Sequence, residues 1–242
     1  PAAARLAAPP ARATIAGSIP CQVMPAMSLQ LQVVPVTPFQ QNCSVIWCDV
    51  TRRAAVVDAG GDIDRILAFV REHDLTVEKL LLTHGHIDHA GGARALADAL
   101  GVQIEGPQRG ESFWLDQLPS QGTMFGFARS EPLTPERWLE EGDTVTVGEE
   151  VLDVLHCPGH TPGHVVFVSH AANLCIVGDV LFQGSIGRTD FPMGNHQQLI
   201  DAIRGKLFAL PDDMVVVPGH GPFTTIGEER RSNPFVADRR YG

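Results

Sequence analysis

Basic residues are scarce in this chain of 242 residues. Only 18 lysines and arginines are present beside 28 aspartates and glutamates, so the formal net charge is −10 at pH 7. Proteins that bind nucleic acids or anionic membranes need a basic face that contacts phosphate groups. The composition therefore argues against both partner classes.

Paired cysteines are also lacking. The five cysteines are odd in number and contain no CxxC pair: Cys21, Cys43, Cys48, Cys157 and Cys175. This pattern predicts a reduced, cytoplasmic protein without a disulfide framework. Although Cys157 lies close to a histidine-bearing turn, we interpret it as a small, buried packing residue.

Residues 1–26 lack acidic side chains and any long apolar run. They cannot span a membrane, which takes about 20 apolar residues. Their richness in Ala and Arg is somewhat like an organellar transit peptide. We favour a disordered tail, upstream of a natural start at Met24 or Met27, followed by one domain over residues 27–242.

A dense group of potential metal ligands follows the apolar residues 80–82. It comprises four potential metal ligands within six positions, His84, His86, Asp88 and His89. In an extended loop, His84 and His86 point the same way, while Asp88 and His89 fall where the next helix begins. One such cluster can supply ligands to two neighbouring metal ions.

Three further potential metal ligands lie at the ends of apolar runs or in Gly/Pro turns. His160 lies in the turn Pro158–Gly163, Asp179 follows residues 174–178, and His220 follows residues 215–219. Such positions lie at the mouth of a sheet. The sequence therefore predicts that these side chains meet the first cluster.

The ordered pattern HxHxDH, GHTPGH, GD and GH resembles that of the metallo-β-lactamase superfamily, over the chain from about Leu29 to its end. Dizinc β-lactamases of this superfamily place Cys where this chain has Asp179, which argues against antibiotic hydrolysis as the native task. The stretch from Gly178 to Phe191 is similar to the short type II glyoxalases, also called hydroxyacylglutathione hydrolases. It is similar to the related persulfide dioxygenases as well.

The resemblance implies an α/β fold, a four-layer αββα sandwich with a site for two divalent metal ions at one edge. Metal one would take His84, His86 and His160. Metal two would take Asp88, His89 and His220, and Asp179 would bridge the two. Zinc is expected first, while imidazole and carboxylate ligands also accept iron or manganese.

The expected chemistry is metal-dependent hydrolysis of a glutathione thioester such as S-lactoylglutathione. A water bound to zinc ionises near neutral pH, its pKa falling to about 7, and the bridging hydroxide would attack the thioester carbonyl. We expect Asp88 and Asp179 to be the catalytic carboxylates of this centre. A thiolate leaves readily, and the sequence has no GxSxG turn that would indicate a serine nucleophile.

Arg188 is the expected substrate-binding residue. It stands where the glyoxalase group has a lysine, whereas Asp190 replaces a tyrosine of that group. Its planar guanidinium can bind a carboxylate of glutathione bidentately, although a structural pair with Asp190 is the alternative. Only 22 residues follow His220, so we expect no counterpart of the C-terminal helical domain that contacts glutathione in the long type II glyoxalases.

A mononuclear-iron glutathione persulfide dioxygenase is the alternative function. The GRTDF stretch from Gly187 to Phe191 fits that group, and His84, His160 and Asp179 form the two-histidine, one-carboxylate set of mononuclear iron oxygenases. A metal-binding regulatory protein without turnover is a third hypothesis. Metal content and oxygen consumption separate the three.

Asp58, at another strand end, resembles the superfamily's aspartate that orients the metal loop through hydrogen bonds. His156 and His164 are expected to pack around the site rather than to bind metal.

The chain alternates patterns typical of strands and helices. Strands are expected at 29–36, 44–47, 54–57, 80–82, 144–147, 151–155, 165–168, 174–177 and 214–217. Helices are expected after an Asp62 N-cap, over 89–100 and over 197–208. Residues 107–137 have no clear period and are either a loop bordering the site or a surface insertion.

Overall fold

A computed structural model describes residues 29–127 and 130–237. The tail expected at residues 1–26 lies outside the described residues. Within the described part, no helix is both long and apolar enough to cross a membrane.

The first half of the chain forms a five-stranded sheet in the order β1-β2-β3-β4-β5. Its first three strands pair antiparallel, and β3, β4 and β5 are parallel. The strands are β1 Leu29–Val36, β2 Gln41–Cys48, β3 Arg53–Val57, β4 Thr76–Leu81 and β5 Gln103–Glu105.

The second half forms a six-stranded sheet in the order β13-β12-β9-β8-β7-β6. All its neighbours pair antiparallel except β9 and β12, which are parallel. The strands are β6 Thr144–Val147, β7 Glu150–His156, β8 Val165–Ser169, β9 Leu174–Gly178, β12 Val215–Pro218 and β13 Thr224–Thr225. A separate hairpin joins β10 Leu181–Phe182 to β11 Ser185–Ile186.

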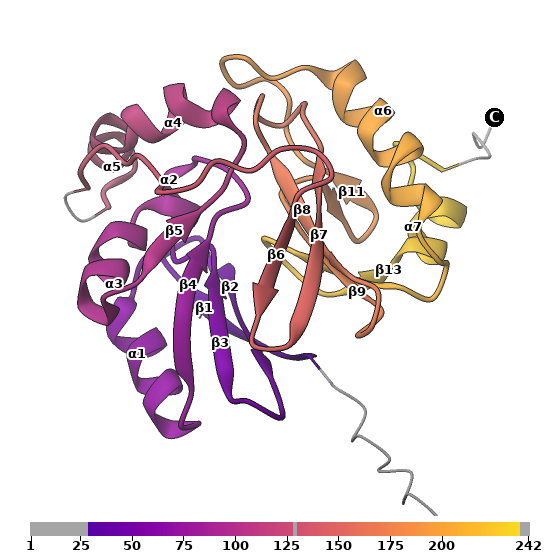
Figure 1. Cartoon of the computed structure of the whole chain (residues 1–242). Helices are drawn as coiled ribbons and strands as arrows, with labels where there is room; N and C mark the ends of the chain where they lie inside the picture. Colours follow the sequence, from indigo (N-terminus) through magenta and orange to yellow (C-terminus); the bar gives the residue numbers. More distant parts are fainter. Residues whose placement is uncertain (1–28, 128–129, 238–242) are drawn as a thin grey trace, which may run out of the picture.

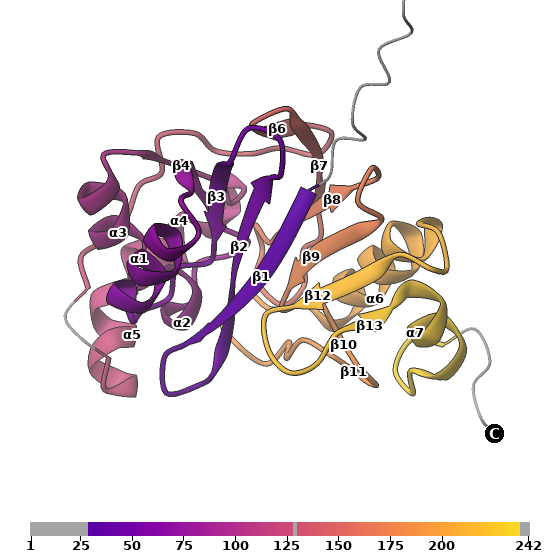
Figure 2. The same cartoon turned by 90° about the horizontal axis from the view of Figure 1, so that it is seen from below.

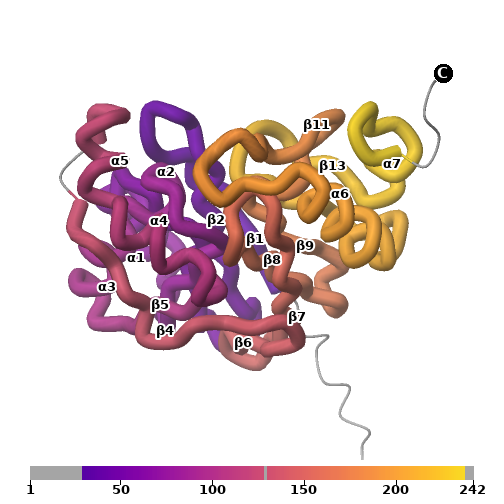
Figure 3. The backbone as a smooth tube through the Cα atoms, turned by 90° about the horizontal axis from the view of Figure 1, so that it is seen from above, coloured from indigo at the N-terminus to yellow at the C-terminus, as the bar shows by residue number. Residues whose placement is uncertain are grey.

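The two sheets pack face to face, with helices on both outer faces (Figures 1 and 2). Apolar residues such as Ile46 and Phe167 fill the layer between the sheets. On one outer face, α1 Ile63–Glu72 and α3 Ala93–Leu100 cover the first sheet. On the other, α6 His196–Gly205 and α7 Ile226–Ser232 cover the second sheet (Figure 3). The expected four-layer αββα sandwich is confirmed.

Both halves bring ligand-bearing segments to the same edge of the sandwich through parallel strand pairs. Val57 of β3 is in register with Leu81 of β4, so Asp58 and the loop that starts at Thr83 leave the first sheet side by side. Pro218 of β12 is in register with Gly178 of β9, which places Asp179 next to the turn that carries His220. The carboxyl ends of parallel strands thereby converge on one site.

Several expected elements differ in detail. The helix expected over 89–100 is two helices, α2 Ile87–Ala90 and α3, because Gly91 and Gly92 separate them. The Gly92 N–H donates to the carbonyl of Ala59 at 2.9 Å, outside the helix, and a Cβ at Gly92 would lie 2.8 Å from that oxygen. The expected helix 197–208 is α6 followed by a short 3₁₀ turn, η2 Leu207–Ala209.

Asp62 does precede α1, but its side chain makes no capping hydrogen bond with the helix. It accepts a hydrogen bond from the backbone N–H of Thr37 at 2.8 Å, from a left-handed backbone conformation with φ 47°. A contact distant in sequence has replaced the local cap.

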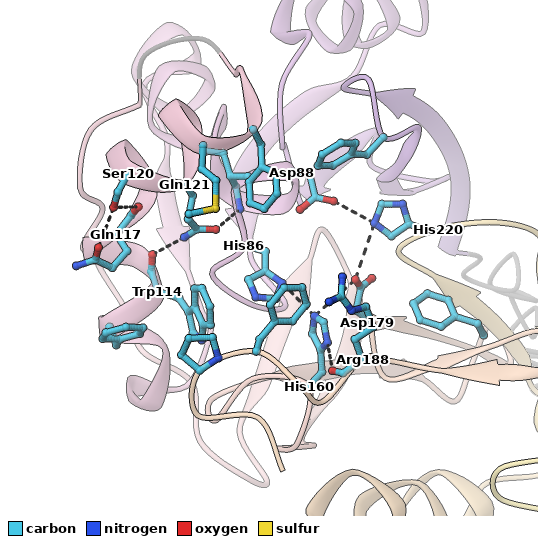
Figure 4. Close-up of a pocket in the computed structure, with 18 of the residues that line it drawn as sticks. His86, Asp88, Trp114, Gln117, Ser120, Gln121, His160, Asp179, Arg188 and His220 are labelled. Carbon is cyan, nitrogen blue, oxygen red and sulfur yellow. Dashed lines mark hydrogen bonds and ion pairs between the residues drawn. The ribbon is translucent and has the colours of Figure 1, made fainter. Parts of the chain in front are cut away.

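Residues 107–137 begin with three short helical segments instead of an irregular loop. They are η1 Arg109–Glu111, α4 Ser112–Asp116 and α5 Leu118–Phe125. The interpretation that this segment borders the site is confirmed, because α4 and α5 contribute to the same cavity as the ligands (Figure 4). The strands β5, β10, β11 and β13 and the helix α7 were not expected from the sequence.

Candidate metal centre

The loop after β4 presents its histidines into the edge of the sandwich. His84, His86 and His89 are all buried, with 0%, 8% and 0% exposure. His86 ends the extended stretch, and α2 begins at Ile87, so Asp88 and His89 project from its first turn. This is the local geometry that the sequence predicted.

Three imidazoles converge in a first group. His86 Nδ1 lies 3.2 Å from His84 Nε2 and 3.0 Å from His160 Nε2. These are the three residues expected to bind metal one, and their ligand atoms all lie within 4.8 Å of one another.

A second group lies beside the first. His220 Nε2 is 3.1 Å from Asp88 Oδ2, and His89 Nε2 is 3.8 Å from the same oxygen. Asp88, His89 and His220 are the residues expected at metal two, and they also satisfy the distances for a shared ion.

Asp179 stands between the two groups. Its Oδ2 lies 3.6 Å from His160 Nε2 in the first group, and its Oδ1 lies 3.4 Å from His89 Nε2 in the second. Oδ1 is buried and has no hydrogen-bond partner, and neither has His89 Nε2. The two atoms form a buried ion-pair contact at 3.4 Å without a hydrogen bond. Such polar atoms are costly unless a further group binds them, so this pair fits a cation.

Close packing holds Asp179 in place. A Cβ at Gly219 would lie 2.3 Å from Asp179 Oδ1 and 2.6 Å from His89 Cε1. Only glycine fits at this position, directly before His220.

The charges of the site favour metal binding. Burial and the neighbouring His160 lower the pKa of His86 to about 3, and burial likewise lowers the pKa of His84 and of His160. Burial opposes ionisation of Asp179, yet the nearby imidazoles, that of His89 first, hold its pKa well below the ordinary value. Neutral imidazoles and ionised carboxylates are the forms that bind metal ions.

His89 differs from the first group. Burial disfavours its charged form, but the carboxylates of Asp179, Asp88 and Asp58 raise its pKa well above the ordinary value. The second group therefore attracts positive charge.

Asp58 orients two of the candidate ligands. One of its oxygens accepts hydrogen bonds from Thr83 Oγ1 at 2.6 Å and from His89 Nδ1 at 2.9 Å, and the other accepts one from Thr83 N at 2.8 Å. Because the Thr83 hydroxyl donates to Asp58, its oxygen accepts from His84 Nδ1 at 3.0 Å. Both histidines thus keep Nε2 free for a metal ion. The ligand atoms of Asp58, His84 and His89 also lie within 4.8 Å of one another, close enough to share a metal ion. The hydrogen bonds described above already occupy the oxygens of Asp58, however.

His160 is oriented from the opposite side. Its Nδ1 donates to the backbone carbonyl of Arg188 at 2.7 Å, which leaves Nε2 free toward His86. His164 packs parallel to His84, with ring centroids 4.7 Å apart, and accepts a hydrogen bond from the backbone N–H of Asp179. His156 instead contacts the carbonyl of Pro162.

Sequence reasoning missed two buried residues that hold the ligand loops. Glu111 accepts hydrogen bonds from the N–H of Gly85 at 2.9 Å and from the N–H of Gly163 at 2.7 Å. Gln121 donates to the carbonyl of Gly85 at 3.2 Å and accepts from the N–H of Ile87 at 3.0 Å. Both come from the helical segment 109–125, whose lack of periodicity gave no signal in the sequence.

Arg188 lies beside Asp179 at the rim of the cavity (Figure 4). Its guanidinium donates to both carboxylate oxygens of Asp190, at 3.0 Å and 2.8 Å, and stacks 4.4 Å from the centre of the Phe191 ring. Both charged side chains are about two-thirds exposed. Arg188 is thus at the site, but Asp190 already engages its planar fork.

The cysteines of the described residues are not part of the centre. The four that lie among the described residues are free and buried. Cys157 packs in the core beneath α6 and α7, and burial raises the pKa of its thiol to about 12.

The fold and the paired ligand groups define a metal-dependent hydrolase. The model of the metallo-beta-lactamase superfamily matches residues 36–220, and the chain belongs to this superfamily. It is 46% identical to the hydroxyacylglutathione hydrolase GloC of Haemophilus influenzae, over 86% of this chain and 98% of that protein.

Solved structures agree with this assignment. BLEG-1, named a B3 metallo-beta-lactamase, superposes with a TM-score of 0.79 at 34% identity, covering 88% of this chain and all of that one. TTHA1623, solved in a di-iron-bound form, has a TM-score of 0.77 at 34% identity, covering 85% of this chain and all of that one. The expected superfamily and enzyme class are confirmed.

Proposed function

We propose that this chain hydrolyses glutathione thioesters of the S-lactoylglutathione type at a dinuclear metal site. The observation that carries the proposal is the position of Asp179 between two complete ligand groups. Its Oδ1 lies 3.4 Å from His89 Nε2, and its Oδ2 lies 3.6 Å from His160 Nε2 and 3.9 Å from His220 Nε2. The name of the relative GloC supports the substrate class.

We propose for the site residues the division that the sequence resemblance implies. His84, His86 and His160 would hold the first ion, and Asp88, His89 and His220 the second. Asp179 would be shared. Zinc is proposed first, with iron or manganese compatible with the same ligands. Bound metal ions supply an ionised water at neutral pH and polarise the substrate carbonyl.

The chain's own residues prepare this chemistry by orientation. Asp58 and Thr83 fix the tautomers of His84 and His89, and the Arg188 carbonyl fixes that of His160. The thiol of glutathione has an ordinary pKa of about 8.5, so the departing thiolate needs little protonation. In this proposal the buried carboxylates therefore act as ligands rather than as proton donors.

The test is a set of assays on metal-replete enzyme. We expect release of free thiol from S-lactoylglutathione, about two metal ions per subunit, and no oxygen consumption with glutathione persulfide. Oxygen consumption with one bound iron would instead support the persulfide dioxygenase. Absence of both reactions, with full metal occupancy, would overturn both functions.

A β-lactam belongs in the same assay because one similar structure is named a β-lactamase. We expect kcat/KM for the thioester to exceed that for the β-lactam. The opposite order would reassign the native substrate.

A further inference from the structure

We propose that an apolar wall formed by α4, α5 and the turn between β1 and β2 binds the acyl group of the substrate, and that it favours thioesters with aromatic or bulky apolar acyl groups over lactoyl. This inference rests on the proposed thioesterase function and specifies its substrate. We call this surface the acyl wall and define it by Phe39, Phe113, Trp114, Met124 and Phe125.

The acyl wall directly adjoins the first ligand group. The Trp114 ring lies 4.6 Å from the His86 ring, centroid to centroid, in an edge-to-face contact. Phe191 completes the corner, at 4.9 Å from His86 and 6.2 Å from Trp114. A substituent on a carbonyl carbon held beside His86 therefore reaches aromatic side chains within a few bonds.

The wall continues outward from Trp114 with unusually exposed apolar side chains. Phe113 is 41% exposed, Phe125 is 46% exposed and Met124 is 76% exposed, and all three line the same cavity of about 660 Å³. Phe39 packs edge-to-face on Phe125, with ring centroids 5.9 Å apart. Large apolar groups that face a cavity gain free energy when an apolar ligand covers them.

Basic charge marks one side of the cavity. Among the described residues that line it, Arg188 is the single lysine or arginine, and it lies beside Asp179 and His160, whereas Trp114, Gln117 and Ser120 lie on the other side of His86 (Figure 4). A tripeptide carboxylate would be attracted to the Arg188 side. The acyl group, on the other side of the scissile carbonyl, would then point to the acyl wall.

A lactoyl group is too small to use this surface. Its methyl group reaches the corner at His86 but leaves the exposed rings of Phe113 and Phe125 uncovered. A phenyl ring in place of the methyl group would cover more of the wall, and one extra apolar group in a pocket typically changes kcat/KM by about 10- to 200-fold. We expect at least about tenfold, because the wall is partly open to solvent.

The test uses two thioesters that differ only at this position. S-mandeloylglutathione and S-lactoylglutathione share the tripeptide and the 2-hydroxyacyl group, and differ by phenyl against methyl. We expect the wild-type enzyme to have the higher kcat/KM for S-mandeloylglutathione. The double variant Phe113→Ala/Phe125→Ala should lose most of that preference, because both side chains are surface-exposed and their removal leaves the core intact.

Phe235→Ala is the matched control. Phe235 is 52% exposed and does not line the cavity, so its removal should leave the ratio of the two kcat/KM values unchanged. Metal content and circular dichroism establish that each variant is folded and loaded.

The outcomes separate this inference from the function on which it rests. Equal or better hydrolysis of S-lactoylglutathione by wild type, or an unchanged ratio in the double variant, overturns the acyl wall and leaves the thioesterase function standing. If metal-replete wild type hydrolyses neither thioester, the proposed function fails, and the acyl assignment fails with it.

Discussion

The Glu111 carboxylate accepts a hydrogen bond at 2.9 Å from the backbone N–H of Gly85, the residue between two candidate ligands of the first metal ion. Its second oxygen binds the N–H of Gly163, three residues after His160. One buried side chain therefore ties together the two loops that supply the first ligand group. Burial raises the pKa of this carboxyl to about 7, although both N–H groups stabilise its charged form.

Glu111→Gln should loosen this connection without changing the size of the side chain. The amide NH₂ group would face a backbone N–H, and a buried donor without an acceptor costs about 1–3 kcal/mol. We expect lower stability of the metal-free protein in urea. Because Glu111 supports the ligand loops, we also expect about 10- to 100-fold weaker metal binding, measured by competition with a chelator.

Glu229→Gln is the control for this variant. Glu229 is buried and accepts hydrogen bonds from Gly184, Thr224 and Asn233, none of which is a candidate ligand or lies next to one in sequence. It should lose stability while metal affinity stays near the wild-type value. Unchanged metal affinity in Glu111→Gln would show that Glu111 does not position the ligands.

The contrast between Glu111 and His84 shows what the sequence could and could not predict. His84 belongs to a dense motif placed directly after a buried strand, and parallel strands carry such ends to a common edge, so the ligand groups followed from local pattern. Glu111 and Gln121 lie in a segment without an apolar stripe. Their role depends on contacts with Gly85 across 26 and 36 residues, which no local pattern encodes.

Tertiary contacts and element length also explain where the secondary structure predicted from the sequence was wrong. The apolar spacing over 89–100 predicted one helix, but the Gly92 N–H bonds to the carbonyl of Ala59 instead of to the preceding turn, and the helix breaks there. The strands β10, β11 and β13 have two residues each. Two residues are too few to show an alternation of apolar and polar side chains in the sequence.

Asp179→Ala should remove the carboxylate shared by the two ligand groups. Two neighbouring cations would then lose part of the negative charge that compensates their repulsion. We expect the metal content to fall below two ions per subunit and turnover to fall at least about 100-fold. Elemental analysis and thioester hydrolysis measure the two effects.

Asp153→Ala provides the comparison, since Asp153 is about half exposed and pairs with His170 away from the centre. It should keep both metal content and activity. Normal metal occupancy with retained activity in Asp179→Ala would refute the shared-ligand assignment, and one tightly held iron in wild type would refute the dinuclear site.

Glu136, which lies away from the metal centre, should make the stability of the protein depend on pH. Burial opposes its ionisation, but the N–H of Ile104 at 2.7 Å and the guanidinium of Arg94 at 3.1 Å lower its pKa below the ordinary value of 4.5. The folded state therefore holds the carboxylate charged at a pH where the unfolded chain binds a proton. Its stabilisation is present above about pH 4.5 and is lost as the pH falls through the folded-state pKa.

Glu136→Gln should thus be less stable than wild type at pH 7, and the difference should shrink as the pH falls through the folded-state pKa of Glu136. The Glu136 side chain is 35% exposed. We therefore expect the difference in the free energy of unfolding at pH 7 to be less than about 1 kcal/mol. Urea unfolding of both proteins across this range measures the gap, with Glu72→Gln on the exposed side of α1 as the control. A gap that widens toward acidic pH would contradict the assignment.

Substitutions of Arg188 and of Asp190 should have opposite effects on substrate binding. If Arg188 holds a carboxylate of glutathione in both the ground and transition states, Arg188→Ala should raise KM several-fold, up to about tenfold, with little change in kcat. Asp190 competes for the same planar fork, so Asp190→Asn should free the guanidinium and lower KM. Arg188→Lys keeps the charge but loses the fork, and its KM should lie between those of wild type and Arg188→Ala. Steady-state kinetics on one glutathione thioester measure KM and kcat of each variant, with its metal content checked. An unchanged KM in Arg188→Ala would assign Arg188 to a purely structural pair with Asp190.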